Sequence, residues 1–300
     1  MLYNVKREIP NNLTLLANAK INLALQVVGK RQDGYHDLKM VMQTLLLNDT
    51  IFMKKIDEPV VTLKTNLSWL PVDNSNLVVK AAQAIRKEFN IKQGVEIHLT
   101  KEIPVSAGLG GGSADCAATL IGMRKLFGLY LPNHELRKIS INLGSDVPFL
   151  LVQGTALVEG KGEIITPLKP HPFIHVLLAK PSFSVSTASV FREYRGPSRV
   201  RNIRHLIKYI EKRDLEGISR NFSNDLEYII SSKSYQIREI KNIMRKNGCI
   251  GTQMTGSGPT VFGYFRSRVS ANYAMQELYQ KGVREVILTG TFNRRKHGNK

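Results

Sequence analysis

The sequence lacks several features that would mark particular classes of protein. It has only two cysteines in 300 residues, Cys116 and Cys249, and neither stands in a metal-ligand pattern. A chain of this length can bury a large core without cross-links, so two free thiols in a reducing compartment are expected. No apolar run reaches the roughly eighteen residues that suggest a membrane-spanning helix, and the N-terminus has no signal-peptide layout. These absences predict a soluble, cytoplasmic protein.

Acidic residues are also scarce. The chain has 24 Asp and Glu against 43 Lys and Arg, which gives a formal net charge of +19. Such a balance occurs in proteins that bind nucleic acid, anionic membranes or polyanionic small substrates. The basic residues are spread through helix-patterned segments at 201–213 and 238–246, with one dense run at 294–296 in the tail, 293–300. The aromatic residues that a single-strand binder interleaves with basic ones are missing. This distribution favours solvated helix faces and a basic tail.

The most distinctive stretch that is present is rich in glycine. Between Pro104 and Ser113, four glycines occupy five positions and lead into a helix-patterned segment. Glycine lets the backbone approach a ligand closely, and a helix N-terminus presents free N–H groups to anions. The stretch has neither the Gly-Lys-Ser/Thr ending of a Walker loop nor the preceding strand of a dinucleotide fingerprint. It predicts a third kind of phosphate-binding loop; the alternative is a flexible linker or a glycine-rich turn.

Alternation near the start of the chain predicts a strand over Leu15–Val28, with Lys20 and Asn22 on the same face. A lysine on a strand is usually exposed to solvent, and that alternative applies to Lys20. Asp33-Gly34 predicts a hairpin turn. Tyr35 and His36 follow this turn, and a strand is predicted after them, over 39–47.

Further along, the pattern predicts two more strands of an antiparallel sheet, a helix that Asn76 caps, and a strand that leads to the glycine loop. Their ranges are Asp49–Lys54, Val60–Leu63, Leu77–Phe89 and Val95–Leu99. Beyond the loop, a helix from 132 is expected to end at Gly144 as a left-handed cap. Asp146 then precedes Pro148 and a short helix, so Asp146 could simply be an N-cap.

Three prolines in residues 167–172 indicate a domain boundary. The second domain is predicted to be an α/β sandwich. Its expected strands are 174–179, 261–265 and 284–288, its expected helices are 187–194, 200–212, 234–246 and 270–280, and a second glycine-rich turn is expected at 251–260.

With these motifs placed, the chain resembles the superfamily of galactokinase, homoserine kinase, mevalonate kinase and phosphomevalonate kinase. Within it, the motifs are most similar to the kinases of 4-diphosphocytidyl-2-C-methyl-D-erythritol, in non-mevalonate isoprenoid biosynthesis. The stretches that carry the resemblance are 19–23, 29–36, 108–113, 144–149, 185–188 and 254–259, of which Asp33-Gly-Tyr-His36 is the most specific. The similarity extends over residues 15 to 290.

The resemblance implies an α+β fold of two domains: an N-terminal ribosomal-protein-like α/β domain over 1–168 and a C-terminal ferredoxin-like α/β sandwich over 169–300. It implies ATP-dependent phosphorylation of the 2-hydroxyl of 4-diphosphocytidyl-2-C-methyl-D-erythritol. ATP and Mg²⁺ are the implied cofactors. No nucleic-acid or membrane partner is expected, and the chain would be a monomer or a homodimer.

The resemblance also implies roles for particular residues. Asp146 would be the catalytic base and Lys20 its charge partner. The residues implied to bind ATP are Asn76, Pro104, Ser106, Ala107, Gly108, Leu109, Gly110, Gly111, Gly112 and Ser113. The residues implied to bind the cytidine substrate are Asn22, Tyr35, His36, Thr187 and Phe191. Tyr35 and Phe191 would stack on the cytosine, and His36 would form hydrogen bonds with the edge of the base. The alternative for Tyr35 and Phe191 is that they are core aromatics.

No dedicated carboxylate cage for Mg²⁺ is predicted, because the ion would be held largely by ATP phosphates and water, with Ser113 as a candidate ligand. Ala114 departs from the family pattern, since many relatives have a second serine there. Two alternatives remain: another small-molecule kinase of the superfamily, and a basic nucleic-acid-binding protein.

Overall fold

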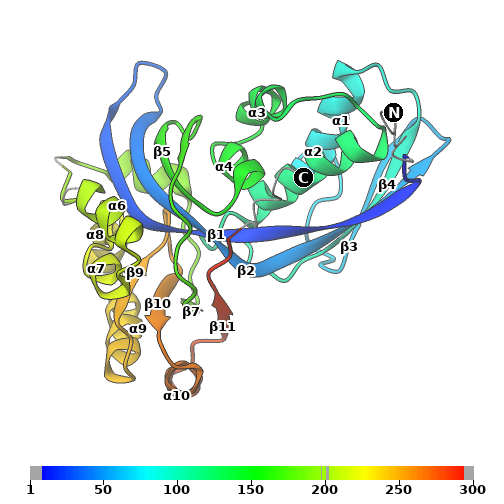
Figure 1. Ribbon diagram of the computed structural model, residues 1–300. Coiled ribbons are helices and arrows are strands. Elements are labelled where there is room, and N and C mark those ends of the chain that lie inside the picture. The colour runs from blue at the N-terminus through cyan, green and yellow to red at the C-terminus, as the bar shows by residue number, and fades with distance from the viewer. Residues whose placement is uncertain (1–8, 197, 201–202, 294–300) are drawn as a thin grey trace, which may run out of the picture. The chain divides into compact units, whose positions relative to one another are not determined.

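The chain forms two β-sheets with helices packed against them, in a computed structural model that describes residues 9–196, 198–200 and 203–293 (Figure 1). Its contacts define two compact units. Unit 1 comprises Met1–Ala17, Asn48–Glu102 and Gly112–Leu151, and unit 2 comprises Asn18–Leu47, Ile103–Gly111 and Val152–Lys300. Two long strands, β1 (Asn12–Lys30) and β2 (His36–Ile56), contribute residues to both units.

Unit 1 contains the second half of β2, which pairs antiparallel with β4 (Gly94–Thr100). Strand β3 (Val61–Thr65) pairs with the other edge of β4 in parallel. The helices of this unit are α1 (Leu77–Glu88), most of α2 (Gly111–Leu126), α3 (Asn133–Ile141) and α4 (Val147–Val152). Helix α1 is amphipathic and buries its apolar face, and Asn76 caps its N-terminus by accepting a hydrogen bond from the Val78 N–H.

Unit 2 contains the first half of β2, which pairs with β5 (Thr155–Gly160), and β5 pairs with β6 (Ile164–Pro167). A second sheet, entirely antiparallel, has the order β11-β7-β10-β9. Helices α9 and α10 pack against this sheet (Figure 1). The bounds of these elements are β7 His175–Lys180, β9 Gly251–Met254, β10 Val261–Phe265, β11 Glu285–Gly290, α9 Tyr235–Lys246 and α10 Arg268–Gln280.

The remaining elements of unit 2 are short. They are α5 (Thr187–Glu193), α6 (Ile203–Lys212), α7 (Leu215–Arg220), β8 (Ser223–Asn224) and α8 (Glu227–Lys233). Strand β8 pairs in parallel with β1 at Ala24 and Leu25. The fully buried rings of Phe262 and Tyr264 in β10 meet the ring of Phe222 and form an aromatic cluster in the core of this unit.

Most of the predicted elements are present, but five predictions were wrong. Residues 39–54 form part of one continuous strand, β2, rather than two strands, and β3 pairs parallel rather than antiparallel. Gly144 does not adopt a left-handed conformation at the end of α3. Residues 251–254 are strand β9, so the second glycine-rich turn is shorter than predicted. Short elements α7, β8 and α8 were missed, because stretches of two to seven residues have too few positions to show a periodicity.

Four further predictions concern the chain as a whole. Both cysteines are free, as predicted. Within the described residues, no helix is long and apolar enough to cross a membrane. The basic run at 294–296 lies outside the described residues, and the domain boundary at 168–169 stays a prediction.

His171 provides a test of the core of unit 2. Its ring is buried, with Nδ1 at 2.6 Å from the Pro172 carbonyl and Nε2 at 3.4 Å from the Tyr264 hydroxyl. Burial lowers the pKa of His171 from 6.5 to about 4, and nearby Arg213 acts in the same direction. Because the unfolded chain takes up this proton more readily, stability falls as the pH drops from about 6.5 towards 4.

We expect the His171 imidazole to lower the free energy of unfolding by about 2 kcal/mol between pH 7 and pH 5. Urea unfolding at the two pH values measures this, with His171→Asn as the comparison. The pH dependence should be smaller by that amount in the variant; an equal dependence in both proteins would contradict the assignment.

Candidate active site

Strand β1 carries two polar side chains inside the core of unit 2. Lys20 is 3% exposed and Asn22 is 1% exposed, which excludes the alternative of a solvent-facing lysine. The Lys20 Nζ donates to Asn22 Oδ1 at 2.8 Å, and the Lys20 backbone N–H donates to the Leu109 carbonyl at 2.9 Å. A buried ammonium is costly unless it is paired and hydrogen-bonded. The strand therefore holds a cation directly beside the glycine loop.

The second glycine-rich turn meets the same two elements. Thr255 Oγ1 accepts a hydrogen bond from the Asn22 N–H at 3.0 Å and lies 3.5 Å from the Gly108 carbonyl. A Cβ placed on Gly256 would lie 3.1 Å from the Gly108 carbonyl and 3.5 Å from Lys20 Nζ. The late turn therefore contacts the glycine loop directly. Strand β1, the glycine loop and the late turn thus form one cluster within unit 2.

The glycine loop lies close to the late turn at Gly108. Gly108 has φ +75°, and a Cβ there would lie 2.6 Å from the Thr255 carbonyl. Such a contact between a Cβ and a backbone oxygen forces the loop and the late turn apart. Gly110 also has a positive φ, of 72°. The loop conformation therefore depends on glycine at positions where the chain has it.

We expect Gly108→Ala to raise the KM for ATP by at least about tenfold, because the loop must move. The matched control is Gly282→Ala, since Gly282 has φ +82° but no atom within 4 Å of an added Cβ. Both variants carry the strain of a left-handed alanine, while only Gly108→Ala carries the clash. Steady-state kinetics and thermal melting measure the two effects, and equal KM values for the two variants would contradict the prediction.

Unit 1 carries the other part of the predicted site. Asp146 is half-buried, directly before α4, and its carbonyl accepts a hydrogen bond from the Leu150 N–H at 3.2 Å. The turn in front of it passes close to the start of α2, since a Cβ on Gly144 would lie 3.7 Å from Ser113 Oγ. Ser113, in the first turn of α2, and the Asp146 turn are thus neighbours. The N-cap interpretation of Asp146 stays an alternative to its predicted role as the base.

The predicted substrate residues lie in unit 2, and several of them are in contact. The His36 and Phe191 rings stack with centroids 5.2 Å apart and an interplanar angle of 26°. Burial, with a contribution from Lys30, lowers the pKa of His36, which favours a neutral ring able to donate and accept. Thr187 Oγ1 lies 2.8 Å from Ser257 Oγ of the late turn. Of the predicted cytidine residues, His36 and Phe191 are therefore in direct contact, and Thr187 contacts the late turn.

Tyr35 differs from a core aromatic because its side chain is 59% exposed. Lys161, on the turn between β5 and β6, lies over the Tyr35 ring with its Nζ 5.1 Å from the centroid. The same ammonium pairs with Asp33 at 3.1 Å, and this hydrogen bond is the main reason why the pKa of Asp33 is lowered. The Asp33–His36 motif is thus an ordered turn with an accessible aromatic ring, and the alternative of a core tyrosine is excluded.

The remaining residues that are predicted to bind ATP are Asn76 and several residues of the glycine loop. Asn76 uses both ends of its amide locally, capping α1 and donating to the Pro71 carbonyl at 2.7 Å. This capping contact is the alternative that the sequence left open, and a role for Asn76 at ATP stays a prediction. In the loop, Ala107 and Leu109 are buried, Pro104 is half-buried, and Ser106 is exposed with φ +54°. The buried side chains of Leu109 and Ala107 therefore anchor the loop.

Sequence analysis missed one residue that holds the site together. The Asn224 side-chain amide donates to the Met254 carbonyl at 2.9 Å and to the Gly256 carbonyl at 2.8 Å. It thereby fixes both ends of the late turn that contacts the glycine loop. Asn224 lies in an unpatterned stretch, and only tertiary pairing of β8 with β1 brings it there. No signal in the sequence singled it out.

Comparison with known proteins decides the family. The chain matches the GHMP kinases N terminal domain over residues 76–154 and the GHMP kinases C terminal domain over residues 206–284. The chain belongs to the GHMP kinase family. The N-terminal match includes the glycine loop and Asp146, which are the motifs that indicated a kinase. The predicted α+β fold of a two-domain small-molecule kinase is confirmed, and the alternative of a nucleic-acid-binding protein loses its basis.

Relatives narrow the position within the GHMP kinases. The chain is 44% identical over 282 residues to the 4-diphosphocytidyl-2-C-methyl-D-erythritol kinase of Caldicellulosiruptor bescii, covering 93% of this chain and 98% of the relative. It is 43% identical to the enzyme of the same name from Lachnospira eligens, covering 94% and 99%. These matches confirm the predicted resemblance to that group of kinases.

Solved structures of kinases share the fold of this chain. A crystal structure of 4-(cytidine 5'-diphospho)-2C-methyl-D-erythritol kinase matches with a TM-score of 0.79 and 28% identity over 94% of this chain and all of the other. Homoserine kinase from Cytophaga hutchinsonii matches with a TM-score of 0.77 but only 18% identity over 96% of each chain, so it shows a shared fold alone.

Proposed function

We propose that this GHMP kinase transfers the γ-phosphoryl group of ATP to the 2-hydroxyl of 4-diphosphocytidyl-2-C-methyl-D-erythritol. The observation that carries the proposal is the cluster in unit 2, where Lys20 and Asn22 of β1, the glycine loop and the late turn contact one another. The stacked His36 and Phe191 rings belong to the same unit as this cluster. The names of the most similar relatives support this substrate.

The loop would hold the ATP phosphates through its backbone N–H groups. Gly108, Gly110 and the N-terminus of α2 provide such donors without side chains in the way. The transition state of phosphoryl transfer is loose, so the enzyme chiefly positions the reactants and balances negative charge. The Lys20 ammonium is buried on a strand whose backbone donates to Leu109, and it would supply positive charge at the loop.

Asp146 would accept the proton of the substrate hydroxyl as its oxygen attacks the γ-phosphorus. The bond between the γ-phosphorus and the β,γ-bridging oxygen breaks, and that oxygen leaves with ADP. The products are ADP and the 2-phosphate of the substrate, and Asp146 returns the proton to solvent. A positioned base of this kind contributes about 10²- to 10⁴-fold to the rate.

Mg²⁺ would enter with ATP. Within the described part of the chain, no group of three or more His, Cys, Asp or Glu side chains is arranged to hold a metal ion. An ion bound mainly by phosphate oxygens and water needs no such group. Ser113 Oγ, in the first turn of α2, would supply a protein ligand. When bound, the ion neutralises charge on the β- and γ-phosphates.

The cytosine base would be recognised by the aromatic residues of unit 2. Phe191 and the exposed Tyr35 offer ring faces for stacking, and the neutral His36 offers a donor and an acceptor for the edge of the base. Cytosine and uracil present opposite donor and acceptor groups at that edge. Discrimination against uracil would follow, because the wrong base leaves polar groups unpaired.

A coupled assay of ADP release tests the proposal. Purified protein with ATP and Mg²⁺ is given 4-diphosphocytidyl-2-C-methyl-D-erythritol, its uridine analogue, mevalonate or homoserine. We expect turnover with the cytidine compound and a kcat/KM at least about tenfold lower with the uridine analogue. Turnover of mevalonate or homoserine alone would replace the proposed substrate with that of another GHMP kinase, and no ADP release with any acceptor would overturn the proposal.

A further inference from the structure

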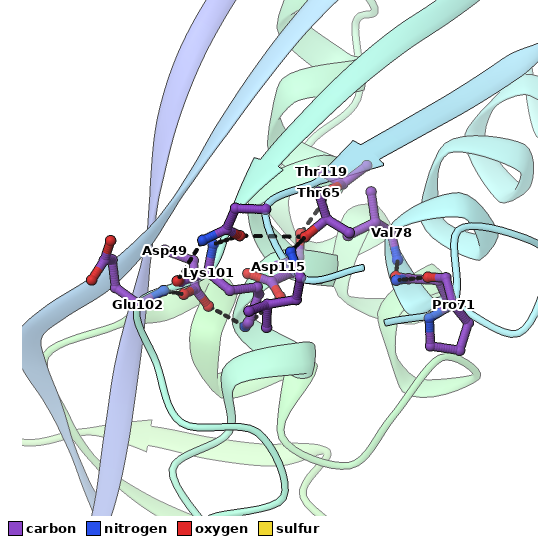
Figure 2. A network of polar contacts seen from close by, with 11 residues as sticks. Asp49, Thr65, Pro71, Val78, Lys101, Glu102, Asp115 and Thr119 are labelled. Carbon is purple, nitrogen blue, oxygen red and sulfur yellow. Dashed lines mark hydrogen bonds and ion pairs between the residues drawn. The ribbon is translucent and has the colours of Figure 1, made fainter. Parts of the chain in front are cut away.

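A buried ionic cluster lies in unit 1, on residues that flank the glycine loop in the sequence (Figure 2). It consists of Asp49, Lys101 and Asp115, which are 0%, 8% and 3% exposed. The Lys101 Nζ donates to the carboxylate of Asp49 and to Asp115 Oδ2, the latter at 2.9 Å. We name these three residues the buried triad. None of its members takes part in the reaction proposed above.

The triad joins the two ends of the loop. Lys101 immediately follows β4, two residues before the loop segment Ile103–Gly111, and Asp115 is the fifth residue of α2, the helix that follows the loop. The Lys101–Asp115 ion pair thus spans fourteen positions of sequence and closes the loop at its base. The pair thereby limits the distance between the residues that precede the loop and the helix that follows it.

The incoming end is fixed by its backbone as well as by its side chain. The Lys101 N–H donates to Asn66 Oδ1 at 2.9 Å, and the Asn66 amide donates back to the Lys101 carbonyl at 3.2 Å. The next N–H, that of Glu102, donates to Asp49 Oδ1 at 2.6 Å. The chain is therefore held at consecutive residues just before it enters the loop, as Figure 2 shows.

Stability alone is a weak reason for such a cluster. Burying charges costs free energy, and an apolar replacement of similar volume is often equally stable or more so. The triad also has two carboxyl groups for one ammonium, and Asp115 Oδ1 is buried without a hydrogen-bond partner among the described contacts. What an ion pair with directional hydrogen bonds provides, and an apolar contact does not, is a defined geometry.

We propose that Lys101 is a positioning residue for ATP, which sets the separation of the two ends of the glycine loop through its contacts with Asp49 and Asp115. The proposal rests on the function proposed above, because it takes the loop to be the phosphate site. Lys101 acts through the backbone of the loop and does not touch the reacting atoms. Its loss should therefore impair the binding of ATP more than that of the alcohol substrate.

The protonation of Asp115 suggests a conservative variant. Burial, together with the neighbouring Asp49 carboxylate, raises the pKa of Asp115 well above its ordinary value, against the opposing effect of Lys101. Its neighbour Cys116 stays a neutral thiol, since burial raises the pKa of Cys116 to about 12. Asparagine has the shape of aspartate and keeps an oxygen that can accept from Lys101 Nζ, so Asp115→Asn retains this contact, whereas Asp115→Leu removes it.

The experiment measures the binding of a non-hydrolysable ATP analogue by calorimetry, beside the KM values for ATP and the alcohol substrate. We expect Lys101→Met to weaken binding of the analogue at least about tenfold, with less than a twofold change in KM for the alcohol. We expect Asp115→Leu to behave like Lys101→Met and Asp115→Asn to bind the analogue within about threefold of the unaltered chain. If Lys101→Met does not fold, the comparison of Asp115→Leu with Asp115→Asn tests the proposal.

Two controls separate positioning from stability. Lys64→Met removes an exposed ion pair with Glu96 at 2.9 Å in the same unit and should leave affinity unchanged. Leu278→Ala truncates a fully buried side chain in α10 and should lower the melting temperature without changing affinity.

The outcomes are distinct. Unchanged affinity in folded Lys101→Met, or equal affinities of the two Asp115 variants, would overturn the positioning role. A loss of affinity in Leu278→Ala as large as in Lys101→Met would reduce the effect to stability and would overturn it too. Failure of the unaltered chain to bind the analogue would overturn the proposed function itself, and the positioning role with it.

Discussion

Asp146→Asn is expected to lower kcat by about 10²- to 10⁴-fold while the protein still folds, because the amide keeps the shape of the carboxyl but cannot accept the substrate proton. The fold should tolerate the change, since Asp146 is half-buried and the contact it makes to Leu150 uses its backbone carbonyl. The KM values should change little, as a general base acts in the transition state.

Single-turnover kinetics of phosphoryl transfer measure this effect, and circular dichroism verifies the fold. Asp214→Asn is a matched control, because Asp214 caps α7 through the Gly217 N–H and asparagine caps equally well. That variant should keep its full rate. Near-normal turnover of Asp146→Asn would remove Asp146 from the mechanism, and the base would have to be another residue.

Lys20→Met has the second largest expected effect, a fall in kcat of about 10²- to 10³-fold. Methionine fits the same buried volume but lacks the charge that would offset the moving phosphoryl group. The Lys20 backbone N–H that donates to Leu109 remains, so the loop keeps its attachment to β1. The variant therefore isolates the ammonium, whose Nζ donates to Asn22 Oδ1.

The split between kcat and KM decides the role of Lys20. A group that binds substrate and transition state equally changes KM alone, whereas a transition-state contact changes kcat. Lys246→Met is the control, since Lys246 forms an exposed ion pair with Glu277 at 2.9 Å on α9. A loss confined to KM would make Lys20 a binding residue only.

The double variant Lys20→Met/Asp146→Asn tests whether the two residues act on the same step. Residues that act as a unit give losses that do not add, and the second substitution then costs much less than the first. Fully additive losses would show that the ammonium and the carboxylate contribute independently.

The local motifs of this protein could be read from the sequence because each depends on backbone geometry or on short-range periodicity. The glycines at 108 and 110 adopt the positive φ that their lack of a Cβ allows. Asn76 caps α1 and Ser234 caps α9, as their side chains predict. Helices α1 and α9 and strand β10 follow the apolar pattern almost to the residue. The kinase family followed from these motifs in their order.

Contacts between distant segments were decided only by the tertiary structure. Alternation shows which side chains share a face of β1 but not that both faces are covered, so Lys20 could have been exposed. The parallel pairing of β3, the position of Asn224 at the late turn, and the meeting of Asp49 with Lys101 and Asp115 each join segments from distant parts of the sequence. Periodicity reports the local direction of a side chain, whereas its partner depends on how the whole chain packs, and one sequence pattern is compatible with many such packings.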